Sequence, residues 1–377
     1  MRIDFHASPR HSVGIEWELA LVDRPTRDLS NDAAELFELA TGRLAHPERL
    51  HKELLRNTVE LVTGISATVG EGVEDLRSTL RAVVAAGDEL GIDLVGAGAH
   101  PFAQWSEQQL TEGHRYEELI NRTQWWGRQM LIWGVHVHVG MPERARVMPV
   151  LSALLTTYPH LLALSASSPV WAGQDTGYAS NRALMFQQLP TAGLPFAFDT
   201  WDQFESCVGD QLMTGVVDDL TEVRWDIRPA PKLGTIENRV CDGVSNLREL
   251  GAIAALVQCL VVDLDTRVAA GERPPVLPPW HVQENKWRAA RYGLDAIVIL
   301  DPTSRERLVT DDLDELLERL EPVARRLDCA DELRAVADIP RHGASYQRQR
   351  QVAAASGGDL VAVVDSLVAE LHASLGS

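Results

Sequence analysis

The sequence predicts an α+β protein built on a mostly antiparallel β-sheet, with helices covering one side of that sheet. Two observations predict this class. Short segments alternate between apolar and polar side chains, which is typical of strands with one polar and one apolar face. Longer segments with apolar residues at helical spacing lie between these strands along the chain. The chain has 377 residues, of which 45% are hydrophobic, and this is ample for a sizeable core.

The expected elements follow in order along the chain. The pattern predicts strands at residues 13–22, 57–63, 92–97, 134–140, 224–228 and 234–241. It predicts helices at residues 31–41, 73–90, 116–132, 149–164 and 247–270. Asn31 or Asp32 is suited to cap the first helix, and Gly91 is suited to end the second.

The composition changes near residue 303, beyond which the chain is charge-rich and carries leucines at helical spacing. We expect this C-terminal portion to be helical and to pack on the sheet, with residues 1–377 forming one domain. The acidic run at residues 311–318 is interpreted as a solvated helix face.

Several classes of protein are excluded by composition. The chain lacks a run of about 18 apolar residues, and its first residues lack the apolar core of a signal peptide. Its net charge of −19 argues against a broad nucleic-acid surface. We therefore expect a cytoplasmic protein that acts on neither membranes nor nucleic acids. Its scattered cysteines, which lack CxxC spacing, are expected to be reduced: Cys207, Cys241, Cys259 and Cys329.

Two glutamates in the first strand are the most informative residues of the chain. Glu16 and Glu18 alternate with Ile15, Trp17 and Leu19, so both carboxylates project from the polar face of the strand. Like charges at this separation repel each other unless a cation lies between them, and a divalent metal ion is the simplest candidate. The alternative is a solvated strand face with two ordinary glutamates.

A second constellation is His136 and His138 in residues 134–140 (GVHVHVG), where both imidazoles share one strand face. Imidazole is a common metal ligand and a donor to phosphate, although a buried histidine often has only a structural role. In residues 234–242 (GTIENRVCD), alternation places Thr235, Glu237, Arg239 and Cys241 on one face. An acid beside an arginine indicates either a metal ligand next to a phosphate-binding guanidinium or a simple ion pair.

Two further segments repeat these residue types. Arg224, Asp226 and Arg228 are expected to share a strand face, and Glu60 is expected on the polar face of residues 57–63. Glu53 precedes that strand in an expected turn or helix end. No Walker A loop, GxSxG elbow or HExxH helix occurs in the sequence, so any ATP must be held in another way.

Taken together and in order, these segments resemble a known family. The likeness covers roughly residues 12–350 and rests on GIEWE, NTVELVTG, GVHVHVG, SPVWAGQDTGYASNR (168–182), WDIRP (225–229), GTIENRVCD and ENKWRAARYG (284–293). The chain resembles the type 2 glutamate–cysteine ligases, or carboxylate–amine ligases, of the glutamine synthetase superfamily. The resemblance implies a curved sheet with helices on its convex face and with ATP, divalent ions and glutamate on its concave polar face.

The resemblance also implies roles for individual residues. It implies metal ligands at Glu16, Glu18, Glu53, Glu60, His136 and Glu237. It implies that His138, Arg239 and Arg228 contact ATP phosphates and that the two arginines are catalytic. Tyr178, Ser180 and Arg182 lie in a family motif for which substrate binding is expected.

The implied activity is an ATP-dependent ligation of the γ-carboxylate of L-glutamate to an amine, nominally L-cysteine to give γ-glutamylcysteine, through an acyl phosphate. The implied cofactors are ATP and Mg²⁺ or Mn²⁺, since carboxylate oxygens suit hard cations. Relatives of this kind suggest a homo-oligomer. The sequence leaves open a different amine acceptor, a metal-dependent amide hydrolase, and a relative that binds nucleotide without turnover.

Overall fold

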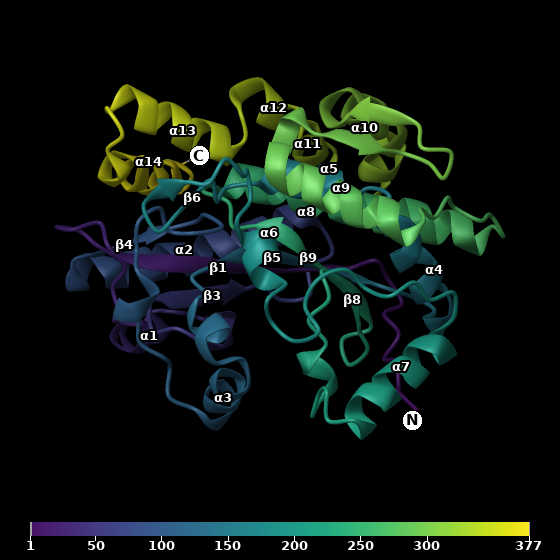
Figure 1. Ribbon diagram of the computed structural model, residues 1–377, viewed down its shortest axis with the longest axis horizontal. Coiled ribbons are helices and arrows are strands. Elements are labelled where there is room, and N and C mark those ends of the chain that lie inside the picture. The colour runs from purple at the N-terminus through teal and green to yellow at the C-terminus, as the bar shows by residue number, and fades with distance from the viewer. Residues whose placement is uncertain (1, 377) are drawn as a thin grey trace.

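A computed structural model describes residues 2–376 and is organised around one antiparallel sheet (Figure 1). The strand order along the sheet is β2 (Leu50–Lys52), β3 (Thr58–Val62), β1 (Val13–Asp23), β5 (Gly134–Gly140), β9 (Thr235–Asp242) and β8 (Ile227–Ala230). β4 (Ile92–Val95) pairs with the end of β1. All of these pairs are antiparallel, so the predicted fold class is confirmed.

β1 is the strand on which the sheet is built. One of its edges pairs with β3, and the other pairs first with β5 and then with β4. Ile15, Trp17 and Leu19 are each no more than 1% exposed and lie in the main core. Their neighbours Glu16 and Glu18 are thereby turned to the opposite face, because successive side chains of a strand alternate.

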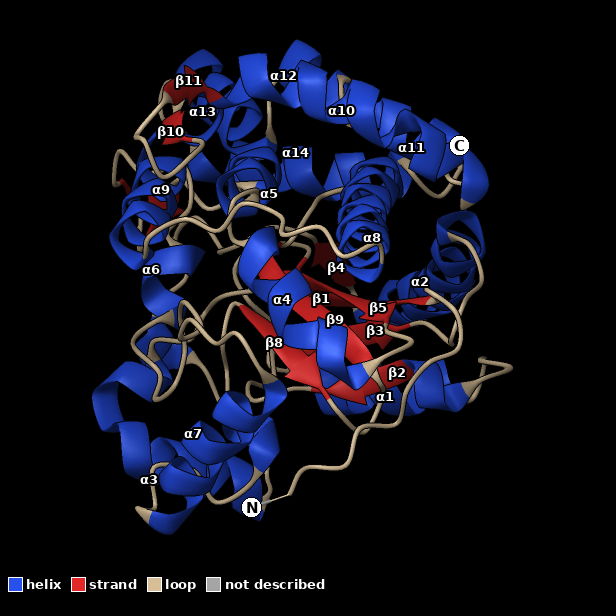
Figure 2. Ribbon diagram, turned by 90° about the vertical axis from the view of Figure 1, so that its right-hand side faces the viewer, coloured by secondary structure: helices blue, strands red, loops and turns tan. Residues whose placement is uncertain are grey.

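Helices cover the apolar face of the sheet (Figure 2). α2 (Val69–Leu90) packs on β1, β3 and β4, α8 (Leu247–Ala269) packs on β5, and α5 (Tyr158–Ser165) packs on β9. α2 begins with a capping box between Thr68 and Glu71 and ends at Gly91, whose φ of 71° is left-handed. α8 is buried along nearly all of its length, as its largely apolar sequence requires.

A second core lies on the opposite face of β1, beyond the glutamates. Ala20 and Val22 continue the register of Glu16 and Glu18 but are apolar, and they pack with Trp133 and the C-terminal helix α14 (Leu360–Ala373). The Trp133 indole N–H donates to Thr58 Oγ1 at 2.7 Å, which satisfies its buried polar atom. The polar part of this face is therefore confined to the first half of β1, which ends at Glu18.

The other elements surround these layers. The helices are α1 (Ala33–Thr41), α3 (His114–Arg128), α4 (Arg144–Leu154), α6 (Arg182–Phe186), α7 (Trp201–Met213), α9 (Pro279–Tyr292), α10 (Val309–Arg326), α11 (Ala330–Ala335), α12 (Asp338–His342) and α13 (Ser345–Ala355). Two small hairpins pair β6 (Val170–Trp171) with β7 (Gln174–Asp175), and β10 (Ile297–Ile299) with β11 (Glu306–Leu308). From Val309 the chain is helical, and the acidic residues of α10 line its exposed side.

Some predicted boundaries are wrong. The single helix expected at residues 149–164 is two helices, α4 and α5, because Thr156 and Thr157 donate to carbonyls of the preceding turn and Pro159 lies in the first turn of α5. The strand expected at 224–228 begins only at Ile227. The helix expected at 116–132 ends at Arg128 and is kinked at Gln124, whose φ is 52°.

Among residues 2–376, no single helix combines the length and apolarity needed to cross a membrane. The bent pair of α4 and α5, which meet at 64°, meets that requirement only when both are taken together.

Asp93 on β4 holds the end of β1 to the C-terminal helix. Its carboxylate accepts hydrogen bonds from Arg24 Nε at 3.0 Å and Arg27 Nη1 at 2.6 Å, and Arg27 also pairs with Asp365 of α14. Burial alone would raise the pKa of Asp93, but the two guanidinium groups lower it below its usual value. This carboxyl stabilises the fold above its unfolded pKa of about 3.9, and the contribution is lost as the pH falls through the lower folded pKa.

We therefore expect Asp93→Asn to reduce the free energy of unfolding at pH 7 by about 1.5–3 kcal/mol. The difference from wild type should shrink as the pH is lowered below about 4. Urea unfolding across a pH series measures both effects. Asp4→Asn, at an 81% exposed carboxyl, is the control and should stay within about 0.5 kcal/mol of wild type. A deficit for Asp93→Asn that is constant with pH would contradict the assignment.

Candidate active site

The strand register gathers the polar residues of the sheet into one band. Glu16 lies opposite His136, and His138 lies opposite Glu237. Glu18 lies opposite Glu60 on the other edge of β1. The band thus runs from β3 through β1 and β5 to β9, and residues far apart in the sequence become neighbours through backbone pairing.

Glu16 is the centre of this band. Its Oε2 lies 2.8 Å from His136 Nδ1, and its Oε1 lies 3.0 Å from His138 Nε2. Burial alone would raise the pKa of Glu16, but the two imidazole hydrogen bonds bring it well below the usual value. Burial lowers the pKa of His136, with the positive charge of Arg239 adding to the effect. Glu16 is therefore held as a carboxylate between two rings.

Glu237 lies between two arginines at the β8 end of the band. Arg228 binds it through both oxygens, with Nε at 2.6 Å and Nη2 at 3.2 Å, and Arg239 forms a second ion pair with it. Although Glu237 is buried, these guanidinium groups lower its pKa strongly. A bidentate arginine also fixes the direction of the carboxylate, so the Glu237 side chain is held in one orientation.

The other end of the band is acidic. Glu18 accepts the Gly134 backbone N–H at 2.5 Å, and Glu60 and Glu53 lie near enough to repel it. Burial raises the pKa of Glu60 well above its usual value, and the charges of Glu53, Glu16 and Glu18 raise it further. Glu53 lies in the turn between β2 and β3. The charges of Arg182 and Arg239 act on Glu18, and that of Arg239 acts on Glu60, but the pKa of both carboxyls stays raised. A cation between these carboxyls would relieve their repulsion.

The donor set fits one or more divalent cations. Two groups of side chains have potential ligand atoms that all lie within 4.8 Å of one another: Glu16, Glu60 and His136, and Glu16, His138 and Glu237. The ring atom His136 Nε2 is buried and has no hydrogen-bond partner among the described residues. Carboxylate oxygens with a single imidazole suit Mg²⁺ or Mn²⁺. Glu18 and Glu53 lie beside these groups without joining them.

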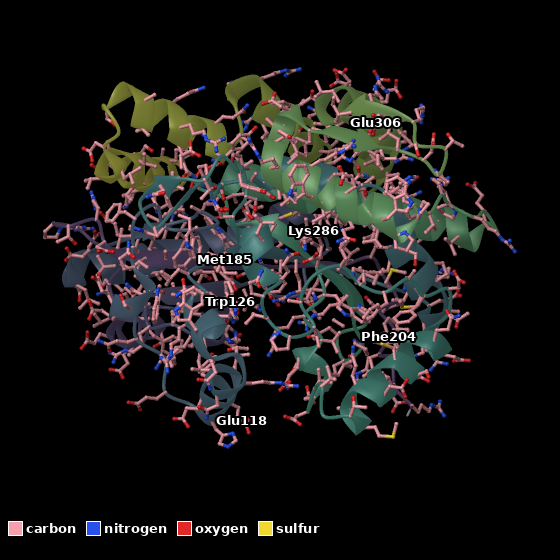
Figure 3. The ribbon with its side chains drawn as sticks, viewed as in Figure 1. Glu118, Trp126, Met185, Phe204, Lys286 and Glu306 are labelled. Atoms are coloured by element: carbon pink, nitrogen blue, oxygen red, sulfur yellow. The ribbon has the colours of Figure 1, made fainter. Side chains whose placement is uncertain are left out.

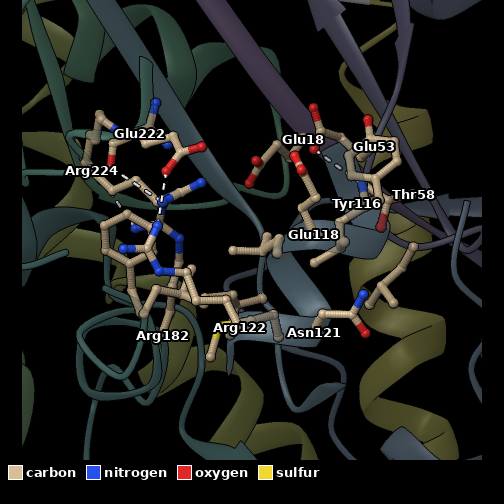
Figure 4. A pocket seen from close by; sticks show the side chains of 18 of the residues that line it. Glu18, Glu53, Thr58, Tyr116, Glu118, Asn121, Arg122, Arg182, Glu222 and Arg224 are labelled. Carbon is tan, nitrogen blue, oxygen red and sulfur yellow. Dashed lines mark hydrogen bonds and ion pairs between the residues drawn. The ribbon is translucent and has the colours of Figure 1, made fainter. Parts of the chain in front are cut away.

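A cavity of about 500 Å³, called the site cavity here, opens beside the band. It reaches the band at Glu18, His136 and Arg239. One side carries Glu18 and Glu53, and the facing side carries Arg122, Arg182 and Arg224 with Glu222 (Figure 4). Apolar side chains also line it, namely Leu54, Leu119, Met130, Ile132, Phe186 and Leu189, and polar ones lie among them, including Thr58, Tyr116, Glu118, Asn121 and Asp218. The cavity therefore has carboxylates at one end, arginines paired with carboxylates at the other, and a mixed wall between them.

Of the three residues in the expected substrate-binding motif, the structure brings only Arg182 to this cavity. Arg182 is 3% exposed, and its Nη1 donates to the Arg239 carbonyl at 3.1 Å. Ser180 is fully buried and donates to Asp242 Oδ1 at 2.8 Å, and Tyr178 contacts Arg291 at a distance of 5.6 Å from the ring centre. Neither Tyr178 nor Ser180 belongs to the described lining of the site cavity.

Asp242 explains what Ser180 does in the fold. Its buried carboxylate also accepts the Ser167 N–H at 3.0 Å and the Ser168 hydroxyl at 2.7 Å. Both ends of residues 167–180 are thereby tied to the end of β9. This holds the start of α6, and so Arg182, against the sheet.

For two residues, the strand face expected from the sequence is wrong. A bulge shifts the register between β5 and β9, so that Cys241 is opposite Val135 whereas Asn238 is opposite Val137. Cys241 consequently points to the helix side, where its Sγ lies 4.0 Å from the Leu161 carbonyl.

Asp226 also leaves the site face. Its carboxylate is buried against Tyr158 and Lys286 at 2.9 and 2.8 Å. Arg224 lies before β8 and reaches the site cavity without being part of a strand face.

Sequence reasoning missed the residues that α3 contributes. Arg122 lies across the cavity mouth, where it pairs with Glu222 at 3.4 Å and donates to the Gly215 carbonyl at 2.8 Å. Tyr116 and Asn121 line the same wall. A short amphipathic helix with exposed polar residues carries no periodic signal for which of them will face a cavity.

Known structures define the class of this fold. The glutamate–cysteine ligase of Francisella tularensis, solved in complex with AMP, aligns with a TM-score of 0.68 at 14% identity, over 99% of this chain and 94% of that chain. A bifunctional glutathione synthetase from Pasteurella multocida aligns with a TM-score of 0.69 at 13% identity, over 97% of this chain and 53% of that chain. The chain has the fold of the glutamine synthetase-like ligases.

The family follows from sequence comparison. Residues 12–366 match the family described as glutamate-cysteine ligase family 2. A protein of Nocardioides sp. named "Putative glutamate--cysteine ligase 2-3" is 71% identical over all of both chains, and a similarly named protein of Mycobacterium ulcerans is 67% identical over 98% of this chain and 93% of its own. The chain belongs to glutamate–cysteine ligase family 2, as the resemblance predicted. It is an ATP-dependent ligase that forms carbon–nitrogen bonds.

The geometry predicts that Glu16→Gln weakens Mn²⁺ binding by about tenfold or more, because Glu16 belongs to both ligand groups and loss of even an outer-shell partner costs about 10–100-fold. Calorimetric titration of the folded protein with Mn²⁺ measures the effect. Glu38→Gln, on an exposed position of α1, should bind Mn²⁺ as wild type does. Equal Mn²⁺ affinity in Glu16→Gln and wild type would remove Glu16 from the metal site.

Proposed function

We propose that this protein joins the γ-carboxylate of L-glutamate to the amino group of an acceptor, with ATP supplying the activation through a γ-glutamyl phosphate. L-cysteine is the nominal acceptor. The observation that carries the proposal is the meeting of a carboxylate and histidine band with an arginine-lined wall at one cavity. A carboxylate and an amine do not condense in water unaided, so phosphoryl transfer must precede amide formation, and it needs both positive charge and positioning.

The acidic band is proposed to hold the divalent cations. Glu16, Glu60, His136 and Glu237 belong to the two ligand groups, together with His138, and Glu18 and Glu53 lie beside them. When bound, such ions supply positive charge that offsets both these carboxylates and the phosphate oxygens of ATP. This accounts for phosphate binding by a chain whose net charge is −19.

Arg228, Arg239 and His138 are proposed to contact the nucleotide phosphates. Arg239 Nε is buried and has no partner among the described residues, and its guanidinium lies at the cavity wall. Glu237 orients both arginines through its ion pairs. Arg228 Nη1 also donates to the Thr221 and Val223 carbonyls, so Arg239 keeps more N–H groups for a phosphate than Arg228 does. In this role, Arg228 and Arg239 stabilise charge that develops during transfer.

Arg182 is proposed to bind the substrate carboxylate. Its guanidinium and that of Arg239 lie 5.6 and 5.8 Å from the Phe186 ring centre, so two cations share one aromatic wall. Tyr178 and Ser180 are proposed to act through the placement of this segment, since both lie away from the cavity lining.

The ligase proposal predicts that ADP forms from ATP only when glutamate, Mg²⁺ and a suitable amine are all present. An ADP-release screen over amines, with cysteine included and mass spectrometry of the products, measures this. The product should gain the mass of the amine minus water. Release of free amine from γ-glutamyl amides without ATP would instead support a hydrolase, and no ADP above background with any amine would contradict the proposal.

Gly134 supplies a test of the Arg182 assignment. A Cβ at this position would lie 2.2 Å from Arg182 Nη2, so Gly134→Ala must displace the guanidinium. We expect kcat/KM for the ADP-forming reaction to fall about 100-fold, the usual cost of misplacing a binding group by about 1 Å.

Gly14→Ala, on the neighbouring strand, is the matched control. Its Cβ would meet His138 Cβ at an ordinary 3.7 Å, so activity should be retained. Thermal melting of both variants separates loss of activity from loss of fold. Full activity in Gly134→Ala would contradict the assignment of Arg182 to the substrate carboxylate.

A further inference from the structure

A second cavity lies on the other side of α6 and the segment that follows it. Its volume is about 600 Å³, and its walls come from α4, from residues 184–197 and from residues 276–287 at the start of α9. Phe186 and Leu189 line the site cavity, whereas Leu184, Gln187 and Gln188 line the second cavity. One short segment therefore separates the two spaces with side chains that point to opposite sides.

Lys286 on α9 (Figure 3) is the ionisable side chain in the described lining of this second cavity. It is 5% exposed, and its Nζ lies 2.8 Å from Asp226 Oδ2. A Cβ on Gly193, another lining residue, would lie 3.9 Å from Nζ, so the ammonium lies beside the segment that lines the cavity. An ammonium has three N–H donors, and the hydrogen bonds of the described residues account for one of them.

Asp226 fixes this lysine without lining the cavity. The Asp226 carboxylate accepts the Tyr158 hydroxyl at 2.9 Å as well as the lysine. Burial raises the pKa of Tyr158 well above its usual value, with the Asp226 charge adding to it, so the phenol remains a donor. The buried aspartate is thus satisfied from two sides, and the remaining lysine donors are left for an acceptor in the cavity.

The rest of the lining defines the body of the ligand. Apolar side chains predominate, and they include Leu155, Leu184, Leu194, Leu277, Val282 and Trp287. Gln187, Gln188 and Gln283 add neutral amides, and the described lining contains no carboxylate that would repel an anion. This lining suits a ligand that has an apolar body and one anionic group that accepts hydrogen bonds.

We propose that the second cavity binds a small monocarboxylate with an apolar or aromatic body, whose carboxylate accepts hydrogen bonds from Lys286. The site uses Lys286 of ENKWRAARYG and Asp226 of WDIRP, neither of which belongs to the described lining of the site cavity. It is linked to the reaction centre through Asp226, whose backbone donates to the Gly193 carbonyl at 2.7 Å and accepts the Arg239 N–H at 2.8 Å.

The test is calorimetric titration of the full chain with 3-phenylpropionate, without ATP or glutamate, so its outcome does not depend on the ligase reaction. We expect 3-phenylpropionate to bind saturably. The uncharged 3-phenylpropanamide should bind with an affinity at least about tenfold lower, because a charge-assisted hydrogen bond is lost. Lys286→Met should lower the affinity for 3-phenylpropionate to the same degree. Lys232→Met, at an exposed lysine outside both cavities, should leave its affinity unchanged.

Two further variants keep the test decisive. The double variant Asp226→Asn with Lys286→Met removes both buried charges and replaces the single variant if that one does not fold. Arg224→Met alters a cation of the site cavity and should not affect 3-phenylpropionate binding. The proposal is overturned if folded wild type shows no saturable binding, if the amide binds equally well, if the lysine variants bind normally, or if Arg224→Met is the variant that loses binding.

Discussion

Repulsion among buried and partly buried carboxylates is the constraint on which the rest of this structure depends. Glu60, Glu16 with Glu18, and Glu237 project from β3, β1 and β9 of one sheet, with β5 between β1 and β9 and with Glu53 beside them. In water such charges would separate, but backbone pairing of the strands holds them close together. The fold must therefore balance them locally. It does so with imidazoles at Glu16 and with arginines at Glu237, whereas burial and the neighbouring carboxylates leave the pKa of Glu60 raised.

The two ends of the band are balanced in different ways, and this has a chemical consequence. At one end Glu237 is paired with Arg228 and Arg239, and Arg228 also donates to the Thr221 and Val223 carbonyls. At the other end the pKa values of Glu18 and Glu60 stay raised although the charge of Arg239 lowers both, so guanidinium groups gather at one end and crowded carboxyls at the other. A centre for phosphoryl transfer requires both conditions side by side. The placement of Arg182 by Asp242 and Ser180 adds one more guanidinium to the arginine side.

Much of the fold and of the band could be predicted because the signals are local. Strict alternation around Glu16, Glu18, His136 and His138 identifies strands with one polar face, and strand pairing then needs little further specification. The boundaries failed where a local exception overrides the pattern. Pro159 starts a new helix inside an apolar run, and the bulge in β9 reverses the face of Cys241. Neither event changes the composition of its segment, so neither is visible as a break in periodicity.

The sequence by itself determined which chemistry this protein carries, because residue type and alternation specify a carboxylate, histidine and arginine face irrespective of how the strands are ordered. The tertiary structure decided which of those residues share a cavity. It turned Asp226 inward to Lys286, tied Ser180 to Asp242, and brought Arg122 of α3 across the cavity mouth to Glu222. The physical reason is that side-chain direction follows local backbone geometry, whereas proximity between distant segments depends on how helices and loops pack to bury apolar surface.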